Sequence, residues 1–374
     1  MNHPYAKRSN RLGFTMTELL MVMMILSLLS AMAAVAYERA SSNAKMQRTE
    51  AIIRKIDSLI MERWDGYRTR ALPMRIPGTM PIRGDSYTDA NLSGHYDGGE
   101  TITRDTNIAG NYVGMYNYGS AEIRLLAIRQ LQRLEMPDRI SDISYGASGV
   151  GYGAYGGNIP TSNPALRRTY LDLFRRATNQ VGVAEASLNW SVWSTQFEGA
   201  ECLYLQIATM RDGDKSALEW FGATEVGDVD NDGMKEILDG WGNPISFLRW
   251  APGYTPNNPS GNQVITTQSR DSVLNPDPFD PLKVDGRYSQ AENAADPFWP
   301  FALRPLIFSS GPDKLFDINS GSIVYATLAN PNDPYFRDRS GAPIGDYIGT
   351  PMDANGDGTL NYSDNITSHD LKGN

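Results

Sequence analysis

The chain has 374 residues, of which 41% are apolar and 21% charged, and its formal net charge is −9. This length predicts one large domain or two smaller ones, with enough apolar residues to bury a sizeable core. Acidic residues outnumber basic ones by 43 to 34 and no long basic stripe occurs, so nucleic acid is not an expected partner. The single cysteine, Cys202, excludes an intramolecular disulfide.

A short polar segment precedes a long apolar run at the start of the chain. Residues 1–13 are polar and partly basic, and residues 14–37 contain Glu18 as their only charge. A helix over the apolar run would be about 36 Å long, enough to cross a bilayer, and it is too long for an ordinary cleaved signal peptide. The basic flank predicts a cytoplasmic N-terminus and a head outside the cytoplasm.

The segment LGFTMTELL at residues 12–20 resembles the leader junction of type IV prepilins and type II secretion pseudopilins. In that family the prepilin peptidase cuts after a glycine and methylates the new amino terminus. A phenylalanine usually follows the cut, and a glutamate stands four residues beyond it. Gly13, Phe14 and Glu18 match these positions, which implies that a leader is removed after Gly13. Leu12 stands where a basic residue is common, and no proline interrupts the apolar run.

Glu18 needs a physical explanation, because a carboxylate in hydrocarbon costs roughly 2.5–3.5 kcal/mol. Cleavage would leave a free or methylated ammonium on Phe14, at the membrane edge. In a filament of parallel, staggered helices, Glu18 of one subunit can pair with the ammonium of a neighbour, which removes two uncompensated charges and fixes the stagger. The alternative is a plain single-span anchor whose Glu18 reaches the lipid headgroups.

Residues 38–72 continue without proline and predict an amphipathic extension of the same helix, which Pro73 and Pro77 end. Its apolar residues recur at helical spacing, at Ile52, Ile53, Ile56, Leu59 and Ile60. We expect this face to pack on the head. The resemblance implies a pilin-like α+β fold, in which a long N-terminal helix packs on a small antiparallel sheet, here with helical and loop insertions.

The rest of the chain divides into two parts. Residues 73–225 are rich in insertions, with irregular loops and predicted helices at 120–134, 164–178, 198–211 and 213–221. Residues 226–374 are expected to hold the sheet and several acidic loops. The DGWGNPISF segment at residues 239–247 resembles one that leads into a sheet strand of major pseudopilins. The insertions imply an enlarged member of that group.

Two acidic loops share the calcium-binding pattern D-x-[DN]-x-D-G with an acid at the twelfth position. The first, DVDNDGMKEILD, offers Asp228, Asp230, Asp232, Glu236 and Asp239. The second, DANGDGTLNYSD, offers Asp353, Asn355, Asp357, the carbonyl group of Thr359, and Asp364. Oxygens at alternate residues converge on one side of a turn, and the glycine permits the positive φ that wraps the chain around an ion. The loops predict one or two structural Ca²⁺ ions, and the alternative is turns that bind no ion.

A different ligand set follows from the resemblance. The segment PLIFSSGPDKLFD at residues 305–317 is similar to a strand and S-x-G-x-D loop of major pseudopilins, in which a calcium ion holds the loop. Asp313 matches the acid of that motif, which implies one ion shared between the 310–318 and 353–365 loops. The sequence leaves this arrangement and the self-contained loops open.

The expected function is structural, because the sequence contains no G-x-S-x-G, H-E-x-x-H, C-x-x-C or P-loop motif and so predicts no enzyme. The hypothesis is a pseudopilin of a type II secretion or type IV pilus-like filament, stored in the inner membrane. Its partners would be other pilin-like subunits, the prepilin peptidase, the inner-membrane assembly platform and the membrane. The alternatives are an adhesin or DNA-uptake minor pilin, and a membrane-anchored calcium-binding domain that never polymerises.

Overall fold

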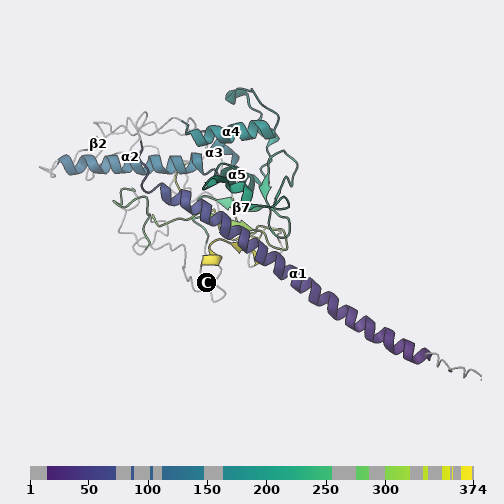
Figure 1. Ribbon diagram of the computed structural model, residues 1–374. Helices are drawn as coiled ribbons and strands as arrows, with labels where there is room; N and C mark the ends of the chain where they lie inside the picture. Colours follow the sequence, from purple (N-terminus) through teal and green to yellow (C-terminus); the bar gives the residue numbers. More distant parts are fainter. Residues whose placement is uncertain are drawn as a thin grey trace, which may run out of the picture. The chain divides into compact units, whose positions relative to one another are not determined.

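A computed structural model describes residues 15–72, 86–87, 102–103, 112–146, 163–254, 275–285, 300–320, 332–335, 348–353, 356 and 364–372. The chain forms two units, Met1–Gln47 and Arg48–Asn374, and each is described by itself. Helix α1 (Met16–Gly66) contributes to both units (Figure 1). It contains no proline, and its only glycine is its last residue, which fits its length.

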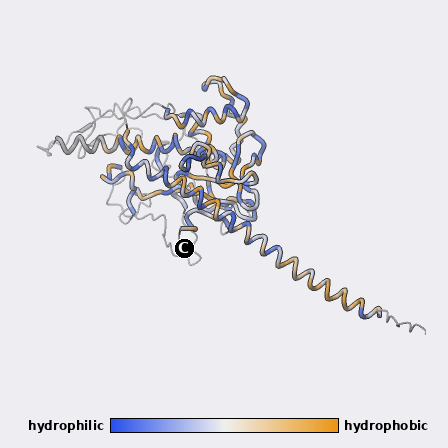
Figure 2. Tube along the Cα trace, in the orientation of Figure 1, coloured by the Kyte–Doolittle hydropathy of each residue, from blue (hydrophilic) through white to orange (hydrophobic). Residues whose placement is uncertain are grey.

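In the first unit, residues 16–47 are all helical, and every side chain is exposed except that of the half-buried Ser41. The apolar residues of this stretch appear as a run of orange along the helix in Figure 2. Among the described helices, α1 alone is long and apolar enough to cross a membrane. The apolar helix predicted over residues 14–37 is therefore present from Met16 onward.

In the second unit, the remaining turns of α1 bury one face. Its buried residues recur every three or four positions, at Thr49, Ile52, Ile53, Ile56, Leu59, Ile60 and Trp64. The apolar residues among them belong to the same hydrophobic core as the sheet strands. The helix ends at Gly66, earlier than expected, because Tyr67 turns into the core and donates a hydrogen bond to Glu135 Oε2 at 2.9 Å.

The main sheet has three antiparallel strands in the order β7 (Ile245–Leu248), β8 (Leu306–Ser309) and β9 (Ile366–Thr367). Every residue of β7 and β8 is buried, so both faces of these strands are covered. Two-residue strands form three further antiparallel pairs: β1–β2 (Ser86–Tyr87, Ile102–Thr103), and the hairpins β3–β4 (Arg211–Asp212, Lys215–Ser216) and β5–β6 (Val226–Gly227, Glu236–Ile237). Small antiparallel sheets together with a long apolar helix and helical insertions confirm the predicted α+β class.

The helices between α1 and the main sheet are α2 (Tyr112–Glu135), α3 (Ile140–Ser144), α4 (Ala165–Ala177) and α5 (Glu198–Ala208). Helix α2 contributes Leu125 and Ile128 to the main core, whereas α3, α4 and α5 contribute to a second hydrophobic core that includes Tyr170 and Phe174 of α4. Helix α5 lies between the two cores, because Leu203 belongs to the main core and Leu205 to the second. This helix therefore joins the inserted helices to the sheet, and it packs on both β6 and β7.

The prediction of a helix over residues 213–221 is wrong for the first half of this segment. Gly213 has φ +58° and lies in the turn of the β3–β4 hairpin, a conformation that favours glycine. Only Ala217–Trp220 is helical, as a single 3₁₀ turn.

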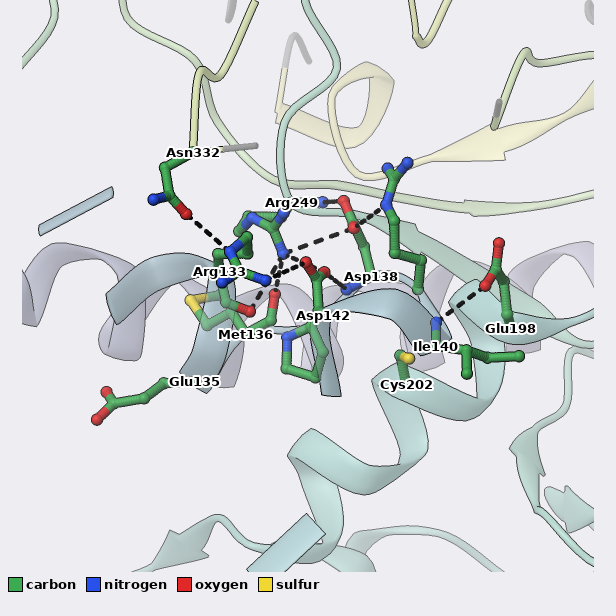
Figure 3. A network of polar contacts seen from close by, with 12 residues as sticks. Arg133, Glu135, Met136, Asp138, Ile140, Asp142, Glu198, Cys202, Arg249 and Asn332 are labelled. Atoms are coloured by element: carbon green, nitrogen blue, oxygen red, sulfur yellow. Dashed lines mark hydrogen bonds and ion pairs between the residues drawn. The ribbon is translucent and has the colours of Figure 1, made fainter. Parts of the chain in front are cut away.

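A buried ion-pair network fastens the α2–α3 corner to the residue that follows β7 (Figure 3). Arg249 Nη1 lies 2.8 Å from Asp142 Oδ2 and donates to the Met136 carbonyl group at 2.8 Å, while the Arg249 amide donates to Asp138 Oδ2 at 3.0 Å. Burial pushes the pKa of Asp138 upward, but the charges of Arg139 and Arg249 outweigh it and hold this pKa well below its usual value. The carboxylates are therefore compensated inside the protein.

Candidate functional site

Glu18 lies in the first turn of α1, whereas Gly13 and Phe14 lie outside the described residues. Its carboxylate accepts hydrogen bonds from the amide and the hydroxyl of Thr15, both at 2.9 Å, and the Thr15 hydroxyl accepts from the Glu18 amide at 3.3 Å. This reciprocal T-x-x-E pair is a capping box, and it also places an acid at the positive end of the helix dipole. Glu18 therefore has a role within one chain that the sequence analysis missed.

The apolar surface that follows Glu18 is continuous around the helix. Its large apolar side chains, from Leu19 to Val35, are between 47% and 71% exposed. A helix that is apolar on all sides needs lipid or other apolar helices around it.

The first predicted calcium loop forms the turn of the β5–β6 hairpin. Asn231 and Gly233 have φ values of +61° and +95°. A Cβ atom on Gly233 would lie 2.8 Å from the carbonyl oxygen of Ala177, at the end of α4, so the turn requires glycine at this position.

Five carboxylates meet at this turn, and we call them the α5 acidic cluster: Glu201 of α5, with Asp228, Asp230, Asp232 and Glu236 of the hairpin. One oxygen from each of Glu201, Asp230 and Glu236 lies within 4.8 Å of the other two. The same holds for Asp228, Asp230 and Asp232, so Asp230 joins the two groups. The alternate-residue pattern of the turn thus brings the oxygens of Asp228, Asp230 and Asp232 close together.

Several N–H groups of the protein fix the carboxylates of the α5 acidic cluster. Asp232 accepts from the Ser194 amide at 2.7 Å and from the Met234 amide at 2.8 Å. Glu236 Oε2 accepts from the Val229 amide at 3.1 Å, and Glu201 Oε2 accepts from the indole nitrogen of Trp193 at 2.5 Å. Each glutamate is thereby held by one oxygen only.

Burial and the mutual repulsion of the carboxylates shift the pKa values of both glutamates in the cluster. Burial raises the pKa of Glu201 to about 10, against the lowering effect of the Trp193 hydrogen bond, and the charge of Asp232 raises it further. Burial likewise raises the pKa of Glu236 to about 7, with the charge of Asp230 adding to the effect.

Asp239, the twelfth residue of the predicted loop, lies outside this cluster. Its Oδ1 accepts from the amides of Trp241 and Asn243 at 2.8 and 2.9 Å, and its Oδ2 accepts from the Ser309 hydroxyl at 2.7 Å. Asp239 therefore caps the turn that leads into β7 and ties it to β8.

A second group, which we call the C-terminal acidic cluster, consists of Asp313, Asp317 and Asp364, with one oxygen of each within 4.8 Å of the others. It joins the loop after β8 to the residues before β9. Gly311 has φ +66°, and a Cβ there would lie 2.6 Å from the Asp364 carbonyl oxygen, so glycine permits the close approach of the two loops. Burial raises the pKa of Asp364, and the charge of Asp313 adds to the rise.

The donors of the C-terminal acidic cluster fit calcium, because all are carboxylate oxygens and the buried Asp364 Oδ1 has no hydrogen-bond donor in the described part of the chain. The pairing of Asp313 with Asp364 corresponds to the shared arrangement implied by the resemblance. Of the other predicted ligands, Asp353 accepts from the Gly356 amide at 2.6 Å. Asn355, Asp357 and Thr359 lie outside the described residues.

Two members of these clusters, Glu201 and Asp317, were not predicted from the sequence. Glu201 lies far upstream of the calcium loop, in a helix that appeared wholly structural, and the only signal was an acid within the apolar run ECLYLQIA. Asp317 is buried and lies in the 310–318 loop, but only Asp313, the acid of the S-x-G-x-D motif, was expected to be a ligand there.

The N-terminal region is similar to a known protein family. A family model of the prokaryotic N-terminal methylation motif matches residues 8–34, which include Gly13, Phe14 and Glu18. The motif points to a type IV pilin-like precursor. No curated protein and no solved structure matches the chain.

A pilin-like precursor of this kind is in general processed by a peptidase and polymerises with pilin-like subunits. The exposed apolar part of α1 agrees with a single-pass membrane anchor, since its length and composition suffice to cross a bilayer. The match covers only the N-terminal region, so the role of the head in such an assembly belongs to the proposals below.

Proposed function

We propose that the protein is a pseudopilin, a structural subunit of a type II secretion or type IV pilus-like filament, cleaved by the prepilin peptidase after Gly13 and assembled through α1. The observation that carries the proposal is Glu18 at the start of a helix whose apolar side chains are exposed on every side, inside a methylation motif. A helix of this kind can be stored in a membrane and transferred into a bundle of identical helices without a change of fold.

The Thr15–Glu18 capping box makes this transfer easier to understand. In one chain the carboxylate is held by the Thr15 amide and hydroxyl, so it is partly satisfied before assembly. Both of these donors are neutral, so among the described residues they leave the negative charge of Glu18 uncompensated. After cleavage, the amine of Phe14 would be the closest new cation on a neighbouring subunit, and pairing with it would neutralise both charges.

The action of such a subunit is mechanical. Subunits would leave the inner membrane, add to the base of the fibre through the assembly platform, and move it outward into the periplasm or onto the cell surface. Contacts between unlike surfaces of successive subunits give an open helical assembly. Calcium held by Asp313, Asp317 and Asp364 would fasten the two C-terminal loops of each head.

Two measurements test the proposal. The first is mass spectrometry of the mature protein from cells that express the peptidase, for which we expect a chain that starts at a methylated Phe14. The second is the filament yield of Glu18→Gln, which keeps an acceptor for Thr15 but removes the charge. We expect normal cleavage and membrane insertion, with a filament yield at least about tenfold lower, because an unpaired cation on each subunit costs more than about 1.4 kcal/mol.

Two matched variants separate charge from capping. Glu38→Gln removes the same charge from an exposed position of α1 and should assemble normally. Thr15→Val removes the hydroxyl partner but keeps the acid, and should retain filaments. A mature chain that still begins at Met1 would favour the non-polymerising anchor, and wild-type assembly of Glu18→Gln would remove the basis of the proposal.

A further inference from the structure

We infer that the α5 acidic cluster binds one calcium ion, and that Glu201 of helix α5 closes a site that the β5–β6 turn only begins. This inference concerns the head alone and does not depend on the proposed function.

The site is strongly acidic and has no cationic side chain paired with it among the described residues. Five carboxylates converge there, and among the described residues no salt bridge reaches any of them. Four other buried acids of the head are paired with arginine: Asp138 and Asp142 with Arg249, and Asp277 and Asp285 with Arg129. The α5 acidic cluster brings more carboxylates together and has no such partner among the described residues.

Several buried carboxylate oxygens of the cluster have no hydrogen-bond partner in the described structure. Glu201 and Glu236 are completely buried, and in each of them Oε1 has no hydrogen-bond partner in the described structure. Both carboxylate oxygens of Asp230 and the Oδ1 atom of Asp228 are also buried atoms without a hydrogen-bond partner in the described structure. Buried polar atoms are paired with few exceptions, so five unpaired oxygens at one place indicate that a ligand belongs there.

The donor atoms of the cluster indicate the identity of the ligand. The cluster contains only carboxylates, without histidine or cysteine, which favours a hard cation over zinc. Calcium accepts six to eight oxygens in irregular geometry, with carboxylates binding through one or both oxygens, whereas magnesium requires a compact octahedron and retains water. Five carboxylates from a turn and a helix suit calcium.

Glu201, rather than Asp239, completes the site. The sequence pattern expects the acid at the twelfth position, Asp239, to complete the site, but Asp239 is held by three donors of its own. Glu201 lies on α5 instead, and its Oε2 is oriented by Trp193. The Trp193 hydrogen bond already restricts rotation of the Glu201 side chain, while Oε1 stays available for an ion. Less side-chain entropy is therefore lost when Glu201 binds the ion.

An ion at this site would connect the β5–β6 turn to helix α5. Met234 of the turn lies in the second hydrophobic core, and α5 packs against β6 and β7. An ion that holds the turn to α5 would link the inserted helices to the sheet. The single cysteine allows no disulfide to do this.

The experiment uses the full chain in detergent, freed of metal with EGTA and then titrated with CaCl₂. Calorimetry and thermal unfolding measure binding and stability, and terbium, excited through tryptophan, reports an ion close to Trp193. We expect a melting temperature at least about 3 °C higher in millimolar calcium than in EGTA, and a smaller effect of magnesium.

The deciding variants are Asp230→Asn and Glu201→Gln. No hydrogen bond to the Asp230 carboxylate is present in the described structure, so an asparagine removes charge without breaking a protein contact. Each variant should weaken calcium binding at this site at least about tenfold and remove the sensitised terbium signal. The exposed Glu219→Gln is the control for charge, and Asp313→Asn separates this site from the C-terminal acidic cluster.

The inference is overturned if Asp230→Asn binds calcium and terbium as the unmodified protein does. It is also overturned if only Asp313→Asn abolishes the effects of calcium. Loss of binding in Asp230→Asn with full binding in Glu201→Gln would confine the site to the turn and remove Glu201 from it.

Discussion

The two parts of helix α1 have the same backbone conformation and opposite surroundings. Over residues 16–47 every described side chain except Ser41 is exposed, and Ile25 is 52% exposed. Over residues 48–66 one face is removed from solvent, and Ile53 and Ile56 are 0% exposed. The same residue type therefore serves two purposes along one helix.

The hydropathy pattern explains this difference. The first part is apolar all round, which no single neighbouring element can cover, so its partners are lipid or other copies of the helix. The second part alternates between apolar and charged positions, for example Ile53 and Arg54, and its apolar face completes the core of the head. Mutations of apolar residues in the first part should therefore affect membrane insertion and filament assembly. Mutations of apolar residues in the second part should affect the stability of the head.

The largest expected effect is that of Ile56→Ala, which removes three methyl or methylene groups from a closed core. We expect the free energy of unfolding of the head to fall by about 2–5 kcal/mol. The matched variant Ile25→Ala should change it by less than about 0.5 kcal/mol, because that side chain contributes nothing to the head. Urea unfolding of the full chain in detergent, followed by tryptophan fluorescence, measures both, and equal effects would contradict the division of α1.

Acid should unfold the second part of α1 with the head and leave the first part helical. The pKa of Asp138 in the folded protein lies below its usual value of roughly 3.9, so its stabilisation is complete above that value and is lost as the pH falls toward the depressed pKa. The only acids in residues 15–47 are Glu18 and Glu38. We expect the urea midpoint of the head to drop below about pH 4 while the circular dichroism of the first part persists.

Asp138→Asn provides the control for this pH dependence. It should be less stable than the unmodified protein at neutral pH, because Arg139 and Arg249 lose a charged partner. Its stability should then vary less between pH 5 and pH 2. A pH dependence unchanged by the substitution would assign the acid sensitivity to other carboxylates.

Local patterns explain which part of this division the sequence could predict. The spacing of Ile52, Ile53, Ile56, Leu59 and Ile60 was sufficient to predict the buried face, and the methylation motif lies in one continuous segment. The partnership of Arg249 with Asp138 and Asp142 could not be predicted, because it joins residues more than a hundred positions apart and leaves no periodic signal. Glu201 was missed because it lies on α5, whereas the other members of its cluster lie on the β5–β6 hairpin, and no local pattern joins the two elements. The T-x-x-E capping box was present in the sequence, but Glu18 was considered only as a partner for a neighbouring subunit.

A smaller effect is expected at Thr49, the first buried residue of α1. Its hydroxyl accepts a hydrogen bond from the Gly240 amide at 2.9 Å, next to the turn that Asp239 caps. Thr49→Val keeps the shape and leaves that amide without this acceptor, which should cost about 1–3 kcal/mol. The same substitution at the exposed Thr17 should leave urea unfolding unchanged, and an equal loss at both positions would show that the effect is not due to the buried hydrogen bond.

The smallest effect is expected one residue earlier, at the start of the second unit. Arg48 Nε lies 3.0 Å from Glu225 Oε1, but the arginine side chain is 46% exposed, so water screens the pair. Solvent-exposed pairs contribute roughly 0.2–1 kcal/mol, and their contribution falls as salt is added. A double-mutant cycle of Arg48→Ala and Glu225→Ala, measured in low and high salt, should therefore give a coupling energy below about 1 kcal/mol that decreases with salt. A larger, salt-independent coupling would mean that the head also holds α1 through Arg48, and that the change from exposed to buried helix begins before Thr49.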